Sequence, residues 1–267
     1  MDRPWLDGRF MTPPRTELQS VVRSHVGHVR ELNEDACLAR PDLGIWAVAD
    51  GMGGHECGDY ASALIVGELG RVRRPGSARE LLQAVDETLA RCNRELIERA
   101  EGGELSGSTI VALLVFEDNF AVIWAGDSRV YRLRDGQLEQ LTRDHSYVQE
   151  LVERGELAPA QARDHPLANR ITRAIGADPQ LHLDVIDGRL EPDDQFLLCS
   201  DGLTGVVEDS AIAALLAELD PQVAVDGLID AALAAGGKDN VSVVVVRNVP
   251  GMDEQTVPHK PLRAKTP

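Results

Sequence analysis

The stretch from residue 45 to 55, with the sequence IWAVADGMGGH, constrains the fold of this chain more than any other. Five apolar residues lead into Asp50, and three glycines follow it within four residues. The apolar run predicts a buried strand. Glycine permits φ > 0 and adds no side-chain bulk, so the backbone can turn sharply and bring a carbonyl beside the Asp50 carboxylate. A hard cation could use both oxygens, although the same pattern also fits an ordinary tight turn.

Asp-Gly pairs are common in hairpins and loops, and most of those in this chain are expected to be turns. Five others begin at Asp7, Asp135, Asp187, Asp201 and Asp226. Asp201 differs from the rest because, like Asp50, it follows an apolar strand and precedes a segment with helical features. Loops at such places commonly carry functional residues on a rigid scaffold.

Two more acids, Asp127 and Asp239, lie beside apolar runs, although one Asp in a connection between strands, as at Asp127, is more often a turn residue than a ligand. Asp127 follows residues 120–125 in the sequence Gly-Asp-Ser-Arg, and Asp239 precedes residues 241–246. Packed sheets can gather such side chains into one pocket, but neighbouring ionised carboxylates raise each other's pKa. Cations remove this conflict, and carboxylate, carbonyl and water oxygens are ligands for Mg²⁺ or Mn²⁺. The residues therefore predict a binuclear Mg²⁺ or Mn²⁺ hydrolase, with Arg30 available for an anion.

Other signatures of metal or phosphate binding are absent from the sequence. There is no GxxxxGK[ST], no HExxH and no EF-hand loop. The four cysteines show neither a CxxC pair nor zinc-ligand spacing, which argues against a disulfide framework or a structural zinc site: Cys37, Cys57, Cys92 and Cys199.

Some polar residues have two interpretations. The cluster at residues 30–35, RELNED, is either part of a site or a solvated turn between two strands. His145 and His165 could be ligands or catalysts, but single histidines without a partner at metal spacing are more often caps or hydrogen-bonded loop residues.

Charge and hydropathy limit the partners and the compartment. A net charge of −17 and a pI near 4.8 argue against nucleic acid or an anionic membrane as the main partner. No apolar run approaches the length of a membrane span, and the first nineteen residues lack the apolar region of a signal peptide. We therefore expect a cytoplasmic protein that neither crosses nor binds a membrane.

Length and composition favour one large domain, since 267 residues with 43% hydrophobic content can bury a substantial core. We expect a flexible arm at residues 1–19, a catalytic domain at residues 20–249 and a disordered tail at residues 250–267. Within the domain, residues 142–176 lose the strand pattern and contain a helix begun by a capping box at Ser146. This segment is expected to form a flap over the site.

The remaining patterns predict alternating groups of strands and helices. Helices are expected at residues 59–69, at 77–99 and twice between 202 and 237, the second with Asp220 as its N-cap. Strands are expected at residues 19–29, 108–116, 120–125, 129–133, 138–141, 183–186, 195–200 and 241–246. The last is almost continuously β-branched, which predicts burial on both faces.

Taken in order along the chain, its short polar motifs resemble those of one protein family. They are Arg30-x-x-Asn33-Glu34-Asp35, Asp50-Gly51-Met52-Gly53-Gly54-His55, Gly107-Ser108-Thr109, Gly126-Asp127-Ser128-Arg129, Thr142-x-Asp144-His145-Ser146, His165-Pro166, Asn169, Thr172-Arg173, Ser200-Asp201-Gly202 and Asp239-Asn240. From about residue 21 to 248 the chain resembles the metal-dependent (type 2C, PPM) Ser/Thr protein phosphatase family in its bacterial form. The resemblance implies an α+β fold, a four-layer α-β-β-α sandwich with two central antiparallel β-sheets flanked by helices.

The resemblance also implies roles for individual residues. Asp50 would bridge two Mn²⁺ or Mg²⁺ ions and the Gly51 carbonyl would bind the second. Asp201 and Asp239 would complete the first, and Asp127 with Asp201 can hold a third. For catalysis, Glu34 and Asp35 would act mostly through metal-bound waters, and Arg30 would bind the phosphate. The implied reaction is hydrolysis of phosphoserine and phosphothreonine in proteins by a metal-activated water, reversing a Ser/Thr kinase.

One departure and two rival functions accompany the resemblance. Eukaryotic relatives have a histidine proposed as general acid two residues after the bridging aspartate, where this chain has Met52, and His55 lies at a different point of the loop. A pseudophosphatase would be expected to lose an acid or the arginine, whereas all are present. A small-molecule phosphomonoesterase would use similar chemistry. The expected partners are phosphoproteins and a cognate Ser/Thr kinase pathway, and the expected state is a monomer.

Overall fold

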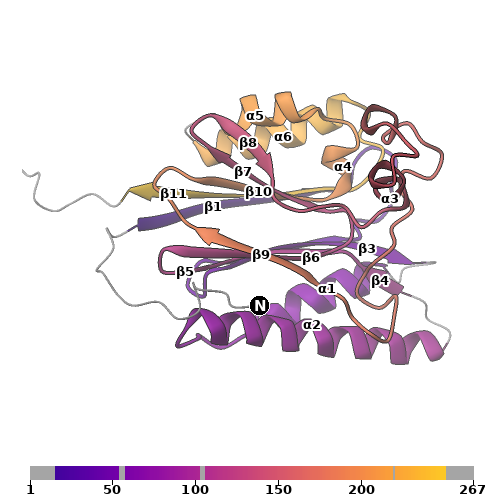
Figure 1. Ribbon diagram of the computed structural model, residues 1–267, viewed down its shortest axis with the longest axis horizontal. Coiled ribbons are helices and arrows are strands. Elements are labelled where there is room, and N and C mark those ends of the chain that lie inside the picture. The colour runs from indigo at the N-terminus through magenta and orange to yellow at the C-terminus, as the bar shows by residue number, and fades with distance from the viewer. Residues whose placement is uncertain (1–15, 54–57, 103–105, 219, 251–267) are drawn as a thin grey trace, which may run out of the picture.

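The computed structural model describes residues 16–53, 58–102, 106–218 and 220–250. Two β-sheets pack face to face, and helices cover the outer face of each (Figure 1). This arrangement confirms the expected four-layer α-β-β-α sandwich.

The first sheet is antiparallel throughout, with the strand order β1-β11-β10-β7-β8. Its strands are β1 (Thr16–His25), β11 (Val241–Pro250), β10 (Gln195–Cys199), β7 (Arg129–Arg134) and β8 (Gln137–Gln140). The expected Asp135-Gly136 turn joins β7 to β8, and both turn residues have positive φ, 50° and 74°. That geometry is the one two-residue hairpins favour.

The second sheet has the order β2-β3-β5-β6-β9, and the short β4 pairs with the end of β3. Its strands are β2 (Asp35–Arg40), β3 (Ile45–Gly53), β4 (Ser106–Ser108), β5 (Ile110–Phe116), β6 (Asn119–Ala125) and β9 (Asp184–Arg189). All its pairings are antiparallel.

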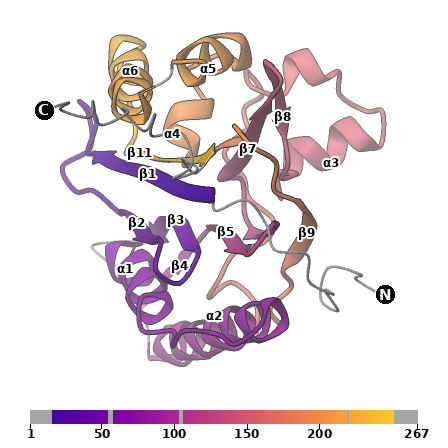
Figure 2. The same cartoon turned by 90° about the vertical axis from the view of Figure 1, so that its left-hand side faces the viewer.

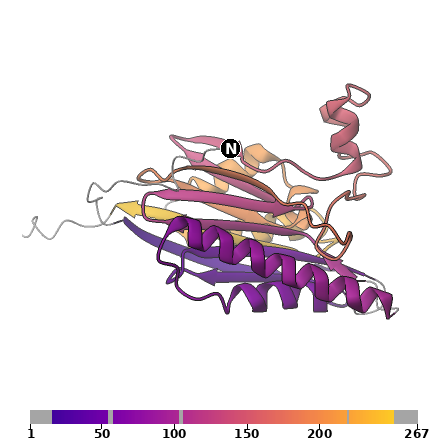
Figure 3. The ribbon, with the colours of Figure 1, turned by 60° about the horizontal axis from the view of Figure 1, so that its bottom comes forward.

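Helices lie on the two outer faces (Figure 2). Those on the second sheet are α1 (Gly58–Leu69) and α2 (Ala78–Glu101), and those on the first are α4 (Asp201–Thr204), α5 (Asp209–Leu216) and α6 (Pro221–Ala234). The flap segment contributes α3 (Tyr147–Glu153) and a 3₁₀ turn at Pro159–Gln161, and α3 stands clear of the layers at one end (Figure 3). None of the helices in the described ranges combines the length and the apolar character that a membrane crossing requires.

The alternation of side chains along the central strands fills three apolar layers. In β3, Ile45, Ala47 and Ala49 face α1 and α2, whereas Trp46 and Val48 pack between the sheets. The expected two-sided burial of residues 241–246 is confirmed, because alternate valines face α4–α6 and the opposite sheet. Helix α6 begins as expected, with Asp220 as its N-cap and Pro221 at the first position.

The chain ends contribute more to the sheet than the sequence suggested. Residues 16–19, expected to belong to a flexible arm, form the first part of β1 and pair with residues 247–250 of β11. Pro250, assigned to the disordered tail, is therefore the last residue of β11. The correction follows from backbone hydrogen bonding between two antiparallel edges, which side-chain patterns reveal poorly. The rest of both expected segments, residues 1–15 and 251–267, lies outside the described residues.

Candidate metal centre

The predicted site residues meet in one cavity of about 250 Å³ at an end of the sandwich. Its lining includes seven of the eight predicted site residues: Arg30, Glu34, Asp50, Gly51, Asp127, Asp201 and Asp239. The others in its wall are Met52, Gly53, Thr109, Asn169, Ile171 and Asn240. The eighth predicted residue, Asp35, lies beside Asp50 on the neighbouring strand.

Antiparallel pairing explains why acids so distant in sequence converge. Asp201 follows the end of β10 and Asp239 precedes the start of β11, and these strands are direct neighbours. In the other sheet Asp127 follows β6, whose end pairs with the start of β5, and β5 begins beside the part of β3 that carries Asp50. The end of one antiparallel strand and the start of the next share an edge, so all four acids reach the same edge.

The glycines after Asp50 act differently from the sequence expectation. No sharp turn follows Asp50, because β3 continues to Gly53 and pairs with β4, Gly51 opposite Ser108. Gly51 is needed for close approach, since a Cβ there would lie 2.1 Å from the carbonyl oxygen of Gly58 at the start of α1. Gly54 and His55 lie outside the described residues.

Neighbouring side chains hold the Asp50 backbone on both sides. The Asp50 N–H donates to Thr109 Oγ1 at 3.1 Å, and its carbonyl accepts from the Thr109 N–H at 2.9 Å. Ser108 Oγ also donates to this carbonyl, at 3.0 Å. The backbone that carries the Asp50 carboxylate is thus held within a strand and not on a flexible loop.

Asp35 presents an unsatisfied oxygen next to the cavity. Its Oδ2 accepts from Ser200 Oγ at 2.8 Å, whereas its buried Oδ1 has no hydrogen-bond partner among the described residues. Burial is the main reason that its pKa rises to about 7. A buried oxygen of this kind calls for an ion or an ordered water.

Electrostatics at the cavity favour cations. Burial first, and then the charges of neighbouring acids, raise the pKa of Asp127 to about 8 and that of Asp201 to about 6. The pKa of Asp50 is also raised, by burial and then by Asp35 and Asp201. Bound divalent ions would offset this repulsion and keep the carboxylates ionised.

The donor set fits Mg²⁺ or Mn²⁺. Carboxylates and the Gly51 carbonyl line the cavity, and none of the lining residues that the structure describes is a histidine or cysteine. Within the described ranges, no three His, Cys, Asp or Glu side chains are grouped closely enough to hold an ion unaided. Waters and carbonyl oxygens would therefore complete each coordination sphere, as is usual for Mg²⁺.

A short loop brings the candidate catalytic residues to the rim. Arg30 Nη2 donates to Asp239 Oδ2 at 2.9 Å, and this contact with the Asp239 charge raises the pKa of Arg30. Burial raises the pKa of Glu34. Asn240 fixes the loop, because its Oδ1 accepts the Glu34 N–H at 2.8 Å and its Nδ2 donates to the carbonyls of Val26 and Leu32, each at 2.9 Å.

The expected flap borders the cavity and a second, larger one of about 780 Å³. The second cavity lies between the flap and the α4–α5 region, and Asp127, Asn169 and Asp201 line both cavities. The two ends of the flap join in an antiparallel bridge of Ser146 with Ile171.

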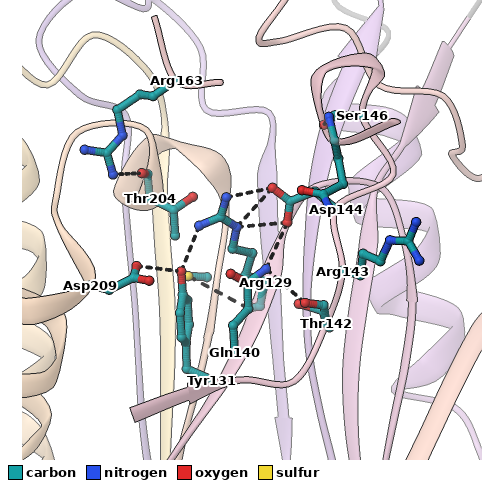
Figure 4. A network of polar contacts seen from close by, with 12 residues as sticks. Arg129, Tyr131, Gln140, Thr142, Arg143, Asp144, Ser146, Arg163, Thr204 and Asp209 are labelled. Atoms are coloured by element: carbon teal, nitrogen blue, oxygen red, sulfur yellow. Dashed lines mark hydrogen bonds and ion pairs between the residues drawn. The ribbon is translucent and has the colours of Figure 1, made fainter. Parts of the chain in front are cut away.

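A polar network anchors the start of the flap (Figure 4). Arg129 grips Asp144 with two nitrogens, Nε to Oδ1 at 2.9 Å and Nη2 to Oδ2 at 2.7 Å. Arg129 Nη1 donates to Tyr131 Oη at 2.9 Å, and the Tyr131 hydroxyl donates to Asp209 Oδ1 at 3.1 Å. Strand β7, the flap and α5 are thereby linked, which sequence reasoning did not identify.

The two flap histidines make hydrogen bonds with the protein itself. His145 Nδ1 accepts from the Gly126 N–H at 3.2 Å, and His165 Nδ1 accepts from the Leu167 N–H at 3.1 Å. Neither lines either cavity. The geometry therefore favours the interpretation of both as hydrogen-bonded loop residues over ligation.

This four-layer fold, with carboxylate and carbonyl oxygens in the described lining of its cavity, is shared with metal-dependent phosphatases of known structure. Residues 18–241 match the family model described as Protein phosphatase 2C, and the chain belongs to that family. The family resemblance found in the sequence is thereby confirmed.

Individual relatives agree with this assignment. Serine/threonine protein phosphatase PstP of Mycobacterium tuberculosis is 37% identical over 232 residues, which cover 85% of this chain and 44% of that relative. The structure of PppA, a key regulatory component of T6SS in Pseudomonas aeruginosa, is 43% identical with a TM-score of 0.81, and the match covers 86% of this chain and 97% of that one. The PstP catalytic domain in complex with two manganese ions is 34% identical with a TM-score of 0.81, covering 88% and 100%.

Proposed function

We propose that the protein hydrolyses phosphoserine and phosphothreonine in other proteins, using bound Mn²⁺ or Mg²⁺. The observation that carries this proposal is the convergence of four aspartates with Arg30 on one cavity, Asp50 from within β3 and the other three from beside strand ends. Membership of the protein phosphatase 2C family supports it, as does the two-manganese complex of a relative.

The ligand assignments are part of the proposal. Asp50, the Gly51 carbonyl, Asp201 and Asp239 would hold two ions, and Asp127 with Asp201 would hold a third. Glu34 and Asp35 would orient water around the ions. Their positions at or beside the cavity, and the unpartnered Oδ1 of Asp35, support these roles.

The chemistry divides between the ions and the chain. When bound, divalent ions would supply a water of lowered pKa and positive charge opposite the phosphoryl group. Arg30 would bind the phosphate oxygens through its planar guanidinium and neutralise charge that spreads over them in the transition state. Its contact with Asp239 holds the guanidinium at the rim before substrate arrives.

Among the described residues that line the cavity, none is an obvious donor of a proton to the leaving oxygen. Met52 lines the cavity where eukaryotic relatives carry the proposed acid, and the described lining residues include no histidine. We propose that water at the site supplies this proton.

Two rivals predict different substrates. A pseudophosphatase would bind phosphoproteins without turnover, and a small-molecule phosphomonoesterase would prefer a sugar phosphate. Comparing kcat/KM for a phosphothreonine peptide and for glucose 6-phosphate in Mn²⁺ separates all three. We expect the peptide to be preferred by at least about tenfold, a difference of roughly 1.4 kcal/mol in barrier. Turnover of the sugar phosphate alone, or of neither, would contradict the proposal.

We further propose that residues 20–249 act as one catalytic domain with residues 142–176 as its flap, and that the chain works as a monomer opposite a Ser/Thr kinase. A cytoplasmic location is proposed because three cysteines in the described ranges are free thiols: Cys37, Cys92 and Cys199.

A further inference from the structure

Asp127 follows Gly126, whose backbone conformation other residues rarely adopt. It lines both cavities, so its carboxylate lies where the metal centre meets the flap. Gly126, immediately before it, has φ +117°, and a Cβ there would lie 2.6 Å from the Cβ of Thr109. Glycine is therefore required at 126, and because glycine has the most conformational freedom of any residue, contacts with neighbouring groups decide how well this backbone is held.

His145 holds this backbone by hydrogen bonding to both the N–H and the carbonyl of Gly126. The His145 N–H donates to the Gly126 carbonyl at 2.9 Å, and the Gly126 N–H donates to His145 Nδ1 at 3.2 Å. The imidazole is only 7% exposed and stacks on Trp124, with ring centroids 5.9 Å apart and an interplanar angle of 13°.

The second ring nitrogen is also engaged. Because Nδ1 accepts from Gly126, the proton of the neutral ring lies on Nε2, which donates to Asp184 Oδ2 at 3.1 Å. Arg173 donates to the other oxygen of Asp184 at 3.0 Å. The ring is thus fixed by a stack, a backbone donor and a carboxylate, and no nitrogen is left for a metal ion or a substrate.

The far side of the same turn is held by the residue before His145. Asp144 accepts hydrogen bonds from two nitrogens of Arg129, the last residue of the Gly-Asp-Ser-Arg turn (Figure 4). Thr142 Oγ1 accepts from the Val130 N–H at 3.0 Å. The start of the flap therefore grips the Asp127 turn before and after the aspartate.

The other end of the flap reaches the strand that carries Asp50. The His145 carbonyl accepts from the Thr172 N–H at 2.8 Å, which ties the two ends of the flap together. Three residues later, Ile175 exchanges two backbone hydrogen bonds with Ser108, whose hydroxyl donates to the Asp50 carbonyl. One contiguous set of contacts thus joins the flap to both sheets at the metal centre.

We propose that His145 is a positioning residue, which holds the Gly126 peptide so that the flap fixes the Asp127 carboxylate at the metal centre. The proposal rests on the proposed function in giving Asp127 a metal-binding role. Its physical consequence is that the Asp127 site and the flap share one hydrogen-bonded hinge, so displacing either one changes the other.

Two substitutions separate the hydrogen bond from ring packing. His145→Phe keeps a ring against Trp124 but removes the acceptor for the Gly126 N–H. His145→Asn loses the ring, yet its amide oxygen can occupy a position comparable to that of Nδ1. A role in packing alone would make Asn the more damaging change, whereas positioning makes Phe the more damaging one.

The first measurement is amide hydrogen exchange at Gly126 in protein held in chelator. We expect exchange about tenfold faster in His145→Phe, the equilibrium change for losing roughly one hydrogen bond, and within about threefold of wild type in His145→Asn. The second measurement is calorimetric titration with Mn²⁺. The ion proposed to bind Asp127 and Asp201 should lose all or about tenfold of its affinity in His145→Phe and keep its affinity in His145→Asn.

His165→Phe is the matched control, because this flap histidine also accepts a backbone N–H but only within the flap. It should leave Gly126 exchange and Mn²⁺ binding unchanged. Nitrogen NMR of wild-type His145 needs no variant and should show Nε2 protonated and Nδ1 bare, so it decides the matter even if Phe fails to fold.

A protonated Nδ1, or equal Gly126 exchange in wild type and a folded His145→Phe, would overturn the inference. Absence of phosphatase activity in the wild type would instead remove the proposed function, and it would leave the exchange and NMR results intact.

Discussion

At the scale of single residues, the acids of the cavity differ in the contacts that each one makes. Asp50 is held by its strand, Asp35 has one oxygen without a hydrogen-bond partner among the described residues, and Asp239 forms an ion pair with Arg30. Asp201 begins α4 directly after β10. These differences predict distinct consequences of substitution.

Asp201→Asn and Asp239→Asn should each reduce kcat by at least about 10²-fold at saturating Mn²⁺, because each removes charge from the ions that supply the nucleophile. Initial rates on a phosphothreonine peptide provide the measurement. Asp187→Asn is the control, since Asp187 also precedes a glycine but is exposed on β9 and does not line the cavity. Wild-type turnover in both site variants would remove the ligand assignment.

Arg30→Ala should mainly raise KM for a phosphopeptide, with a smaller fall in kcat, because the guanidinium would bind phosphate in both the ground and transition states. Its side chain is 51% exposed at the rim, so substrate can reach it. Arg71→Ala, at a side chain 77% exposed beside α1, should leave KM unchanged. An unaltered KM in Arg30→Ala would show that Arg30 does not contact the phosphate.

At the scale of elements, the flap is held at its ends and, along its length, by Arg163. Arg163 Nη2 donates to the carbonyls of Thr204 and Val207 at 3.0 and 3.3 Å, and Arg163 also pairs with Glu208. Arg154 pairs only within the flap among the described residues, with Glu150 and Glu156. The two arginines are therefore not equivalent.

Arg163→Ala should release the flap from α4 and speed amide exchange across residues 147–170, which we expect already to exchange faster than β10 and β11. It should lower kcat/KM for a phosphoprotein, which must dock over the flap, and leave an aryl phosphate within about threefold. Arg154→Ala is the matched control for flap exchange. Equal loss on both substrates would indicate that the flap supports the site instead of selecting substrates.

Most elements could be predicted from local pattern, because burial imposes a period of two on β3 and β11 and capping residues mark α2 and α6. Predictions were wrong where a partner distant in sequence decides the outcome. Gly51–Gly53 looked like a turn because the pairing strand, β4, begins at Ser106. Residues 16–19 looked like an arm because their partner lies at the other end of the chain.

The same limit applies to the site. The order of the acidic motifs along the chain was sufficient to predict which residues share one cavity. Asn240 belongs to a recognisable motif, Asp239-Asn240. Its contacts with Val26 and Leu32 could not be predicted, because they span more than 200 residues of sequence. The bond of His145 to Gly126 depends on how the flap folds back on β6, which no local pattern reports.

At the scale of the whole molecule, the acidic edge makes stability depend on pH and on metal. The pKa of Asp35 is about 7 and that of Asp127 about 8 in the folded protein, against about 3.9 in an unfolded chain. At pH values between the unfolded and folded pKa, these two carboxyl groups bind more protons in the folded state than in the unfolded state. The free energy of unfolding in chelator should therefore fall as pH rises from about 4 to about 8.

Saturating Mn²⁺ should reverse this trend, because ions bind the ionised carboxylates and displace their protons. Thermal unfolding across this pH range, with chelator and with Mn²⁺, tests the expectation. The Tm difference between the two conditions should widen towards high pH and shrink in Asp127→Asn. A Tm in chelator that rises over the same range would contradict the electrostatic account.

The central claim is that this cavity hydrolyses phosphoproteins with bound divalent ions. Its most direct test is phosphate release from a phosphothreonine peptide by the wild-type protein, first in excess chelator and then after Mn²⁺ is restored. We expect no release in chelator, because without cations neither the nucleophile nor the charge opposite the phosphoryl group is available. Activity should return with Mn²⁺ or Mg²⁺. Full activity in excess chelator would contradict the account.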